Sequence, residues 1–485
     1  MRYPGSRVAQ WPWLPHNPPV EKDASPAIAQ PETSVPARRS AVLHRTLNKT
    51  YPVAVRGEGA WLFDAEGKKF LDFASSAIVN FIGHGDPAIV RAMTEQASRL
   101  EFAHSSNFTT EVAEQFAQEL LDFAGPAFRD GAVFFTSGGS ESVESALKLA
   151  RQYQVESGHS ERYQVVSRRQ SYHGATLGAM AVSGNESRRG IYLPMLREFS
   201  KANIPYCYRC PYNCGNGCAD CGLKYAAEVE RAIAETDGAS AAFIMEPISG
   251  ATLGAAAPPP AYVKRVAEIC RGQHVLLLAD EVMTGFGRTG RRFAMDHYGV
   301  APDMIATGKG ISSGYAPLGA VIAQRHVVDA IANGSGTLLH GFTYNGHPVS
   351  VATGRAVLQR LIDGHLIEAA ATDRAGSVAS ILKDELQKLW KLDNVGDVRG
   401  TGLLGAVEFV ADKCTKQPYP AEKKFAARVN ECALKRGVML YPMQGCVDGK
   451  RGDHVMIAPP AIITADEIRW AVEQLSEAIH EARAS

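Results

Sequence analysis

The 485-residue sequence has no excess of charge of either sign, because 51 Lys and Arg residues balance 51 Asp and Glu residues. We therefore expect no polybasic surface and neither a nucleic acid nor a membrane as a partner. The sequence also lacks a run of about 18 uninterrupted apolar residues, which a membrane-spanning helix needs. Its first residues are broken by prolines and lack the basic and then apolar order of a secretory signal. A cytoplasmic location is expected.

Cysteine is sparse except in one short stretch. Five of the nine cysteines lie between residues 207 and 221, namely Cys207, Cys210, Cys214, Cys218 and Cys221. Two C-x2-C pairs in this stretch have a spacing compatible with Zn²⁺. The odd count and the Pro, Gly and Asn residues between them also fit disulfide or thiol redox chemistry, or ordinary packing of a loop. We favour packing and predict no metal, with the other two alternatives left open.

The length exceeds the size at which one hydrophobic core stops growing, so at least two core-forming units are expected. Residues 1–44 are rich in proline and are expected to form an arm. Residues 101–348 alternate short, continuously apolar runs with helical patterns, which is typical of an α/β domain whose mainly parallel sheet is buried on both faces. Residues 45–100 and 349–485 are expected to form a smaller α+β domain from both chain ends.

A Gly-rich segment follows the first of these strand-like runs. Residues 132–136 are apolar, and Ser137-Gly-Gly-Ser-Glu141 then opens a helical pattern. Glycines let backbone N–H groups approach an anion, and a helix N-terminus supplies partial positive charge. Gly139 and Ser140 are therefore candidate phosphate ligands. The same residues would also serve an ordinary helix start.

A carboxylate, Asp280, stands at the end of the apolar run Leu276-Leu-Leu-Ala279. Ligands of open α/β sheets bind at the carboxyl ends of the strands. A buried carboxylate must be paired, and a protonated pyridine nitrogen would be a suitable partner. Alternatively, Asp280 pairs with a nearby arginine, Arg288 or Arg291, or caps the following segment.

Lys309 lies between two glycines, directly after the apolar run Met304-Ile-Ala-Thr307. An amine in a confined and partly desolvated site has a lowered pKa and can act as a nucleophile. The alternative is a surface turn. The order of a Walker phosphate loop is absent.

These three elements occur in an order that strongly resembles the class III aminotransferases, which belong to the fold type I enzymes of pyridoxal 5′-phosphate. The resemblance extends from about residue 61 to the C-terminus, and the interval from Asp280 to Lys309, 309 − 280 = 29 residues, matches that family. Further matching segments are Leu71-Asp-Phe73, Gly83-His-Gly85, Tyr172-His-Gly-Ala-Thr176, Glu246-Pro247, Gly287-Arg-Thr-Gly290, Pro317-Leu-Gly319, His340-Gly-Phe-Thr-Tyr344 and Arg399-Gly-Thr-Gly-Leu403.

The resemblance implies a role for each matching residue. Lys309 would form the Schiff base with pyridoxal phosphate and then move the proton of the substrate carbon. Asp280 would pair with the pyridinium nitrogen, while Tyr172 and Val282 would cover the two ring faces. The same resemblance adds further cofactor-binding residues: Gly139, Ser140, His173, Glu246 and, from the neighbouring subunit of a homodimer with a shared active site, Thr343.

The resemblance also bears on the substrates, a small-molecule amino donor and an oxo-acid acceptor. Relatives that act on ornithine-like amino acids carry an arginine where this chain has Met456. The segment Gly452-Asp-His454 resembles the branch that transfers amino groups from amines or ω-amino acids to pyruvate, in which Arg451 or Lys450 would bind the carboxylate. Both could instead be solvated charges. Use of 2-oxoglutarate, another reaction on the same fold (aminomutase, decarboxylase or racemase) and a non-catalytic cofactor-binding protein remain alternatives.

Overall fold

The computed structural model describes residues 34–36, 40–212 and 219–484. The chain divides into two compact units, one of residues 1–55 with 63–68 and one of residues 56–62 with 69–485. In the first unit, β1 (Ser34–Pro36) pairs in antiparallel fashion with β2 (Thr50–Pro52). Most of the arm predicted over residues 1–44 lies outside the described residues. Among those described, no helix is long and apolar enough to cross a bilayer.

A seven-stranded sheet organises the second unit, with the strand order β6-β12-β11-β10-β9-β7-β8. Five neighbouring strands, from β11 to β8, pair in parallel, which agrees with the predicted mainly parallel sheet. Only β12 runs antiparallel to its neighbours, β11 and β6. The strands are β6 (Ala132–Thr136), β7 (Gln164–Arg168), β8 (Lys201–Ala202), β9 (Ser240–Met245), β10 (Leu276–Asp280), β11 (Met304–Thr307) and β12 (Gly319–Ala323).

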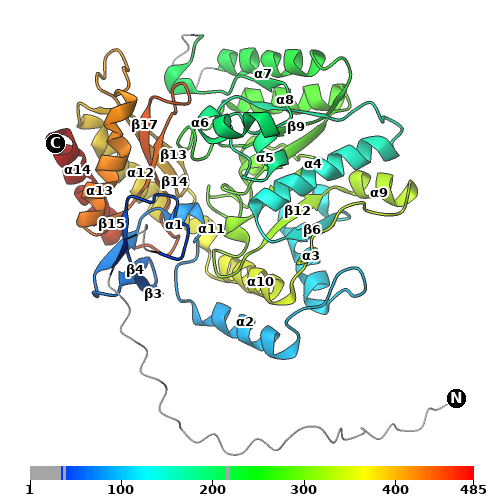
Figure 1. Ribbon diagram of the computed structural model, residues 1–485, viewed down its shortest axis with the longest axis horizontal. Helices are drawn as coiled ribbons and strands as arrows, with labels where there is room; N and C mark the ends of the chain where they lie inside the picture. Colours follow the sequence, from blue (N-terminus) through cyan, green and yellow to red (C-terminus); the bar gives the residue numbers. More distant parts are fainter. Residues whose placement is uncertain (1–33, 37–39, 213–218, 485) are drawn as a thin grey trace, which may run out of the picture. The chain divides into compact units, whose positions relative to one another are not determined.

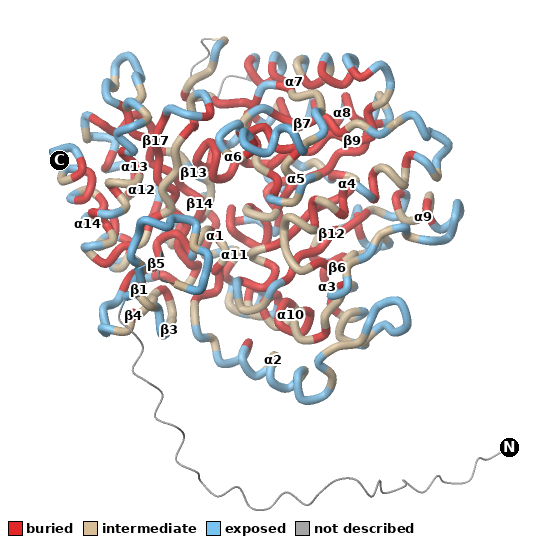
Figure 2. Tube along the Cα trace, in the orientation of Figure 1, coloured by how far each residue is buried: buried red, intermediate tan, exposed pale blue. Residues whose placement is uncertain are grey.

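Helices cover both faces of this sheet, because successive strand residues point to opposite sides. Phe243 and Leu277 pack with α7 (Ala219–Ala234) and α8 (Pro260–Gly272), which lie side by side in Figure 1. Their neighbours Ile244 and Leu276 point the other way. They pack with residues of three helices, α4 (Gly139–Glu156), α5 (Leu177–Val182) and α9 (Arg325–Asn333). The strands β9, β10, β11 and β12 are accordingly buried along their length (Figure 2).

The chain after the large sheet forms a second, antiparallel sheet of order β13-β14-β17-β16. Its strands are β13 (Val395–Thr401), β14 (Leu404–Phe409), β16 (Tyr441–Gln444) and β17 (Asp453–Ile457). Buried residues of these strands form one hydrophobic cluster with residues of six helices: α2 (Pro87–Arg99), α3 (Glu111–Ala124), α10 (Pro348–Asp363), α12 (Val378–Lys388), α13 (Phe425–Lys435) and α14 (Ala465–Ala484). In addition, β5 (Lys69–Asp72) pairs in parallel with β15 (Val438–Met439).

A largely buried polar cluster links this second sheet to the segment that follows β9. Arg399 forms ion pairs of 2.8 Å with both Asp397 and Glu408, and its Nε donates to the carbonyl oxygen of Gly254. His454 in β17 donates from Nε2 to the carbonyl oxygen of Ala251, 2.8 Å away. Burial, with Arg399 nearby, lowers the pKa of His454 to about 4.

This buried histidine makes stability depend on pH. The unfolded chain, with a His pKa near 6.5, binds more protons than the folded chain as pH falls from about 6.5 towards 4, so stability is lost over that window. We expect His454 to account for about 2 kcal/mol of lost unfolding free energy between pH 7 and pH 5. Denaturant unfolding at both pH values should show this loss in the natural chain. His454→Gln should show a smaller loss, and an identical loss in both proteins would contradict the prediction.

Candidate active site

Five loops that carry predicted site residues lie at one edge of the large sheet, because they follow strands that run in the same direction. Ser137 to Ser140 follow β6, Glu246 follows β9, Asp280 ends β10, and Lys309 follows β11. Tyr172 lies in the loop after β7. The carboxyl ends of parallel strands are the usual ligand site of an open α/β sheet. The candidate site residues, which the sequence had indicated separately, therefore lie at the same edge of the sheet.

Asp280 is buried at the end of β10, and both of its carboxylate oxygens accept hydrogen bonds. Oδ1 accepts the N–H of Val282 at 3.1 Å, and Oδ2 lies 2.7 Å from Nδ1 of His173. The carboxylate therefore holds the proton of His173 on Nδ1. Neither Arg288 nor Arg291 pairs with Asp280 in the described part of the chain, so that alternative is not what the structure shows.

Lys309 begins a short 3-10 turn, Lys309–Ile311, after the end of β11. Its φ of 45° is rare for a residue with a side chain, and such strain is typical of functional sites. Burial lowers the pKa of its amine to about 8, although the negative charges of Asp280 and Glu246 oppose that shift. No described residue forms a hydrogen bond or ion pair with Nζ. The lowered pKa and the lack of a described partner make Lys309 a candidate nucleophile.

The N-terminus of α4 offers backbone N–H groups at the same edge. Gly138 precedes the helix, and no side chain caps it. A Cβ on Gly139 would lie only 2.5 Å from Cγ1 of Val282, so the close approach of this loop to Val282 requires glycine. The Ser140 hydroxyl accepts the N–H of Ala175 at 3.0 Å, which ties the helix start to the loop after Tyr172. An 18-residue helix with an uncapped N-terminus suits a phosphate group.

Glu246 positions the backbone of Tyr172. Its carboxylate accepts the N–H of Tyr172 at 3.3 Å and the N–H of Gly250 at 3.0 Å, and burial raises its pKa. The ring of Tyr172 is half-buried, and the guanidinium of Arg188 lies 4.3 Å from its centroid. Arg188 could not be predicted as a site residue, because nothing in its local sequence distinguishes it from the adjacent Arg189.

Two further candidates lie in exposed turns. Thr343 is exposed, and His340, just before it, contacts Ser145 of α4 at 2.8 Å. Arg451 is exposed as well, and its Nε forms an ion pair of 2.7 Å with Asp448 in its own turn. The structure therefore does not bring Thr343 or Arg451 into a described contact with Lys309.

The structure describes only part of the cysteine-rich stretch, because Cys214 and Cys218 lie outside the described residues. Cys221 is buried in the cluster formed by α7 and α8, and Cys210 packs against the same cluster. Within residues 34–36, 40–212 and 219–484, no group of three or more His, Cys, Asp or Glu side chains could hold a metal ion.

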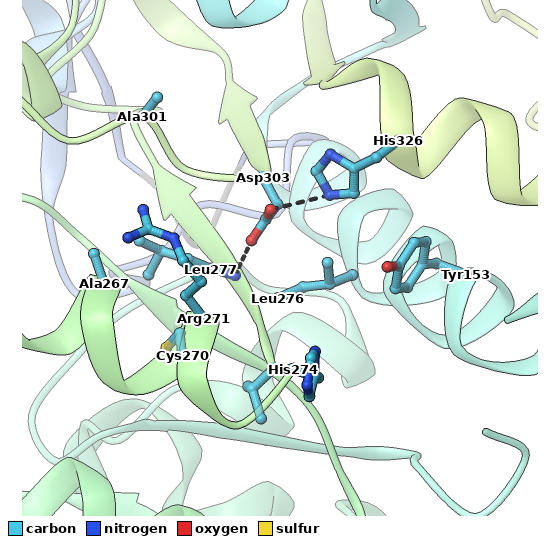
Figure 3. A pocket seen from close by; sticks show the side chains of 11 residues that line it. Tyr153, Ala267, Cys270, Arg271, His274, Leu276, Leu277, Ala301, Asp303 and His326 are labelled. Atoms are coloured by element: carbon cyan, nitrogen blue, oxygen red, sulfur yellow. Dashed lines mark hydrogen bonds and ion pairs between the residues drawn. The ribbon is translucent and has the colours of Figure 1, made fainter.

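A cavity of about 190 Å³ lies at the opposite edge of the sheet (Figure 3). It is lined by the start of β10, by Asp303 before β11 and by His326 of α9. Asp303 accepts the N–H of Leu277 at 2.6 Å and lies 3.0 Å from Nε2 of His326, so its carboxylate is already used structurally. No predicted site residue lines this cavity.

Comparisons with known proteins show which family the chain resembles. The family model of aminotransferase class III matches residues 43–479. The chain is 36% identical to an adenosylmethionine-8-amino-7-oxononanoate aminotransferase of Geobacter sulfurreducens, over 88% of this chain and 92% of that protein. It is similar to the crystal structure of an (S)-enantioselective omega-transaminase from Thermomicrobium roseum, with a TM-score of 0.83, 33% identity and coverage of 91% and 95%. A PLP-bound amine transaminase from an uncultivated Pseudomonas species gives a TM-score of 0.82, 34% identity and coverage of 89% and 95%.

The fold and the site thus define a transaminase of the fold type I group. The chain belongs to the class III aminotransferases, a family of pyridoxal-phosphate-dependent enzymes.

A substitution that changes no charged group can test whether the close contact between Gly139 and Val282 matters for cofactor binding. Gly139→Ala places a methyl group against Val282, and overpacking of this size should raise the Kd for pyridoxal phosphate roughly 10-fold. Absorbance titration of the cofactor-free protein would measure it. Gly272→Ala, at the end of α8 where an added Cβ meets no atom within 4 Å, is the control. An unchanged Kd for Gly139→Ala would show that this glycine is not needed for the cofactor.

Proposed function

We propose that this enzyme binds pyridoxal phosphate through Lys309 and transfers an amino group from an amine or an ω-amino acid to an oxo acid, with pyruvate as the first choice. The observation that carries the proposal is the convergence of Lys309, Asp280 and the N-terminus of α4 at one sheet edge. The residues fit the cofactor, because an amine without a described partner, a buried carboxylate and uncapped helix N–H groups match its aldehyde, ring nitrogen and phosphate.

When bound, pyridoxal phosphate supplies an electron-withdrawing ring that stabilises negative charge at the substrate carbon. Lys309 would attach it and then take and return the proton at that carbon, for which a pKa near 8 is well placed. Asp280 would hold the ring nitrogen protonated, and His173 would fix the carboxylate. We place the phosphate at Gly139 and Ser140, the ring between Tyr172 and Val282, and Glu246 beside them.

Substrate choice rests on a narrower observation. Met456, which stands where ornithine-type relatives carry an arginine, is buried in an apolar cluster with Ile248 and Met283. A thioether in that setting cannot bind a carboxylate. This favours amine and ω-amino acid donors, and the similar structures from Thermomicrobium and Pseudomonas are those of an omega-transaminase and an amine transaminase. We also propose a homodimer in which Thr343 of the neighbouring subunit reaches the phosphate, in a cytoplasmic location.

A donor panel tests this proposal. The holoenzyme is mixed with single amines, ω-amino acids and ornithine without an acceptor, and the cofactor absorbance is followed. Pyruvate or 2-oxoglutarate is then added to the converted enzyme. We expect amines or ω-amino acids to convert the cofactor and pyruvate to restore it. Conversion by ornithine alone, or restoration by 2-oxoglutarate alone, would contradict the proposed substrates.

A further inference from the structure

The backbone after β7 folds back on itself and brings two adjacent arginines, Arg188 and Arg189, to the active-site edge. The carbonyl oxygen of Ser171 accepts the N–H groups of Gly184 and Asn185 at 3.0 and 3.1 Å. These bonds place the short helix α6 (Glu186–Arg189) beside Tyr172. The backbone is closely packed at this turn, because a Cβ on Gly184 would lie 2.2 Å from a backbone oxygen. The position of α6 is therefore set by backbone contacts.

The two arginines of α6 have different surroundings. Arg189 is buried and forms ion pairs with Glu186 and Glu198. Arg188 is half-buried and stacks on the ring of Tyr172, with Nη2 3.6 Å from the sulfur of Met443. A thioether is a weak acceptor and cannot neutralise a guanidinium. Among the described residues, Arg188 has no acidic partner.

Two other arginines near this edge are already engaged. Arg288 donates to the backbone carbonyl oxygens of Ala458 and Pro459, at 3.0 and 2.7 Å. Arg451 is paired with Asp448. The charge of Arg188 is also close enough to lower the pKa of Lys309, behind the larger effect of burial. Arg188 is thus a cation near the amine of Lys309. The N–H groups of its guanidinium remain available to an anion.

We propose that Arg188 binds the carboxylate of the oxo-acid acceptor and of ω-amino acid donors, whereas amine donors that lack a carboxylate do not use it. A guanidinium presents parallel N–H donors that match a carboxylate, and stacking on Tyr172 holds its plane in place. This inference rests on the proposed function, in which Lys309 carries the cofactor, and it names the residue that recognises the substrate class.

The test compares Arg188→Gln with Arg197→Gln. Arg197 also stacks on an aromatic ring, that of Tyr163, at 4.5 Å, but it lies exposed outside the site. The pyridoxamine phosphate form of each enzyme is assayed in a half-reaction with pyruvate (or 2-oxoglutarate where pyruvate is not accepted), and the pyridoxal phosphate form is assayed with 1-phenylethylamine, which has no carboxylate. For Arg188→Gln we expect KM for the oxo acid to rise roughly 10- to 100-fold, with less than about a 3-fold change for the amine. Arg188→Lys should recover part of the loss, and Arg197→Gln should behave like the natural enzyme.

A binding measurement supplies a readout that needs no turnover. Propionate, a carboxylate that cannot react, should bind the natural holoenzyme in calorimetry and should bind Arg188→Gln at least about 10-fold more weakly. Equal loss for oxo acid and amine, weaker retention of the cofactor, or loss of propionate binding in Arg451→Gln alone would overturn the inference. Borohydride reduction is run first on each protein. Failure to link the cofactor to Lys309 would refute the proposed function, whereas a linked cofactor with unchanged propionate binding would refute only the role of Arg188.

Discussion

Replacing Lys309 with alanine is expected to lower the rate of transamination by about 10³-fold or more. Transfer of a proton by a positioned group contributes about 10²- to 10⁴-fold, and loss of the covalent attachment adds to that effect. The backbone should tolerate the change, because alanine at a φ of 45° is no more strained than lysine. Steady-state kinetics on the purified variant, with its unfolding free energy measured alongside, would give the result.

Lys309→Arg is the matched control for charge. It keeps a cation at the position, but a guanidinium is not deprotonated in proteins and so cannot act as the nucleophile. We expect it to be as inactive as the alanine variant. If either variant kept more than about a tenth of the natural rate, Lys309 would not be the base that general acid–base catalysis requires.

The lowered pKa of Lys309 predicts how the rate of cofactor capture depends on pH. Because the folded-state pKa is about 8 and not 10.5, the neutral amine forms at a lower pH than in free lysine. The rate at which cofactor-free protein captures pyridoxal phosphate should therefore rise about tenfold per pH unit below pH 8 and level off above it. Stopped-flow absorbance would follow the capture. A rate that still rises steeply above pH 9 would show an amine that is not desolvated.

Replacing Asp280 with asparagine is expected to reduce kcat by about 10²- to 10³-fold. Removing one member of a buried, hydrogen-bonded charge pair costs roughly 3–4 kcal/mol, which corresponds to this range of rates. The amide has nearly the same size, but it can accept only one of the two hydrogen bonds that Val282 and His173 donate to the carboxylate. His173 would then carry its proton on Nε2.

A carboxylate at the other edge of the sheet supplies the control. Asp303 also accepts a backbone N–H and contacts a histidine, His326, but it precedes β11 and lies far along the strand from Lys309. Asp303→Asn should lower stability and leave kcat within about 3-fold of the natural value. If Asp280→Asn were as active as Asp303→Asn, the negative charge of Asp280 would have no part in the reaction.

Much of the site could be predicted from the sequence because each candidate follows a strand with a strong local signal. The apolar runs predicted β10 and β11 closely, and with them the positions of Asp280 and Lys309 at strand ends. The antiparallel strand β12 was not predicted, since its residues, Gly319–Ala323, form only a brief apolar run after a proline. Its place between β6 and β11 depends on pairings with distant residues.

Two pairings could not be predicted in the same way. The contact between His173 and Asp280 joins residues 107 positions apart, and the stacking of Arg188 on Tyr172 depends on how the chain turns after β7. A sequence pattern reports local spacing, whereas these contacts depend on which loops meet at the sheet edge.

The sequence by itself determined the type of fold, the order of the reactive groups and the family, because apolar periodicity and short motifs are local properties of the chain. Only the tertiary structure decided that Asp280 pairs with His173, that Met456 is part of an apolar cluster and that, among the described residues, Arg188 has no acidic partner whereas Arg451 pairs with Asp448. The physical reason is that pairing and burial depend on the neighbours that folding brings together across the sheet edge.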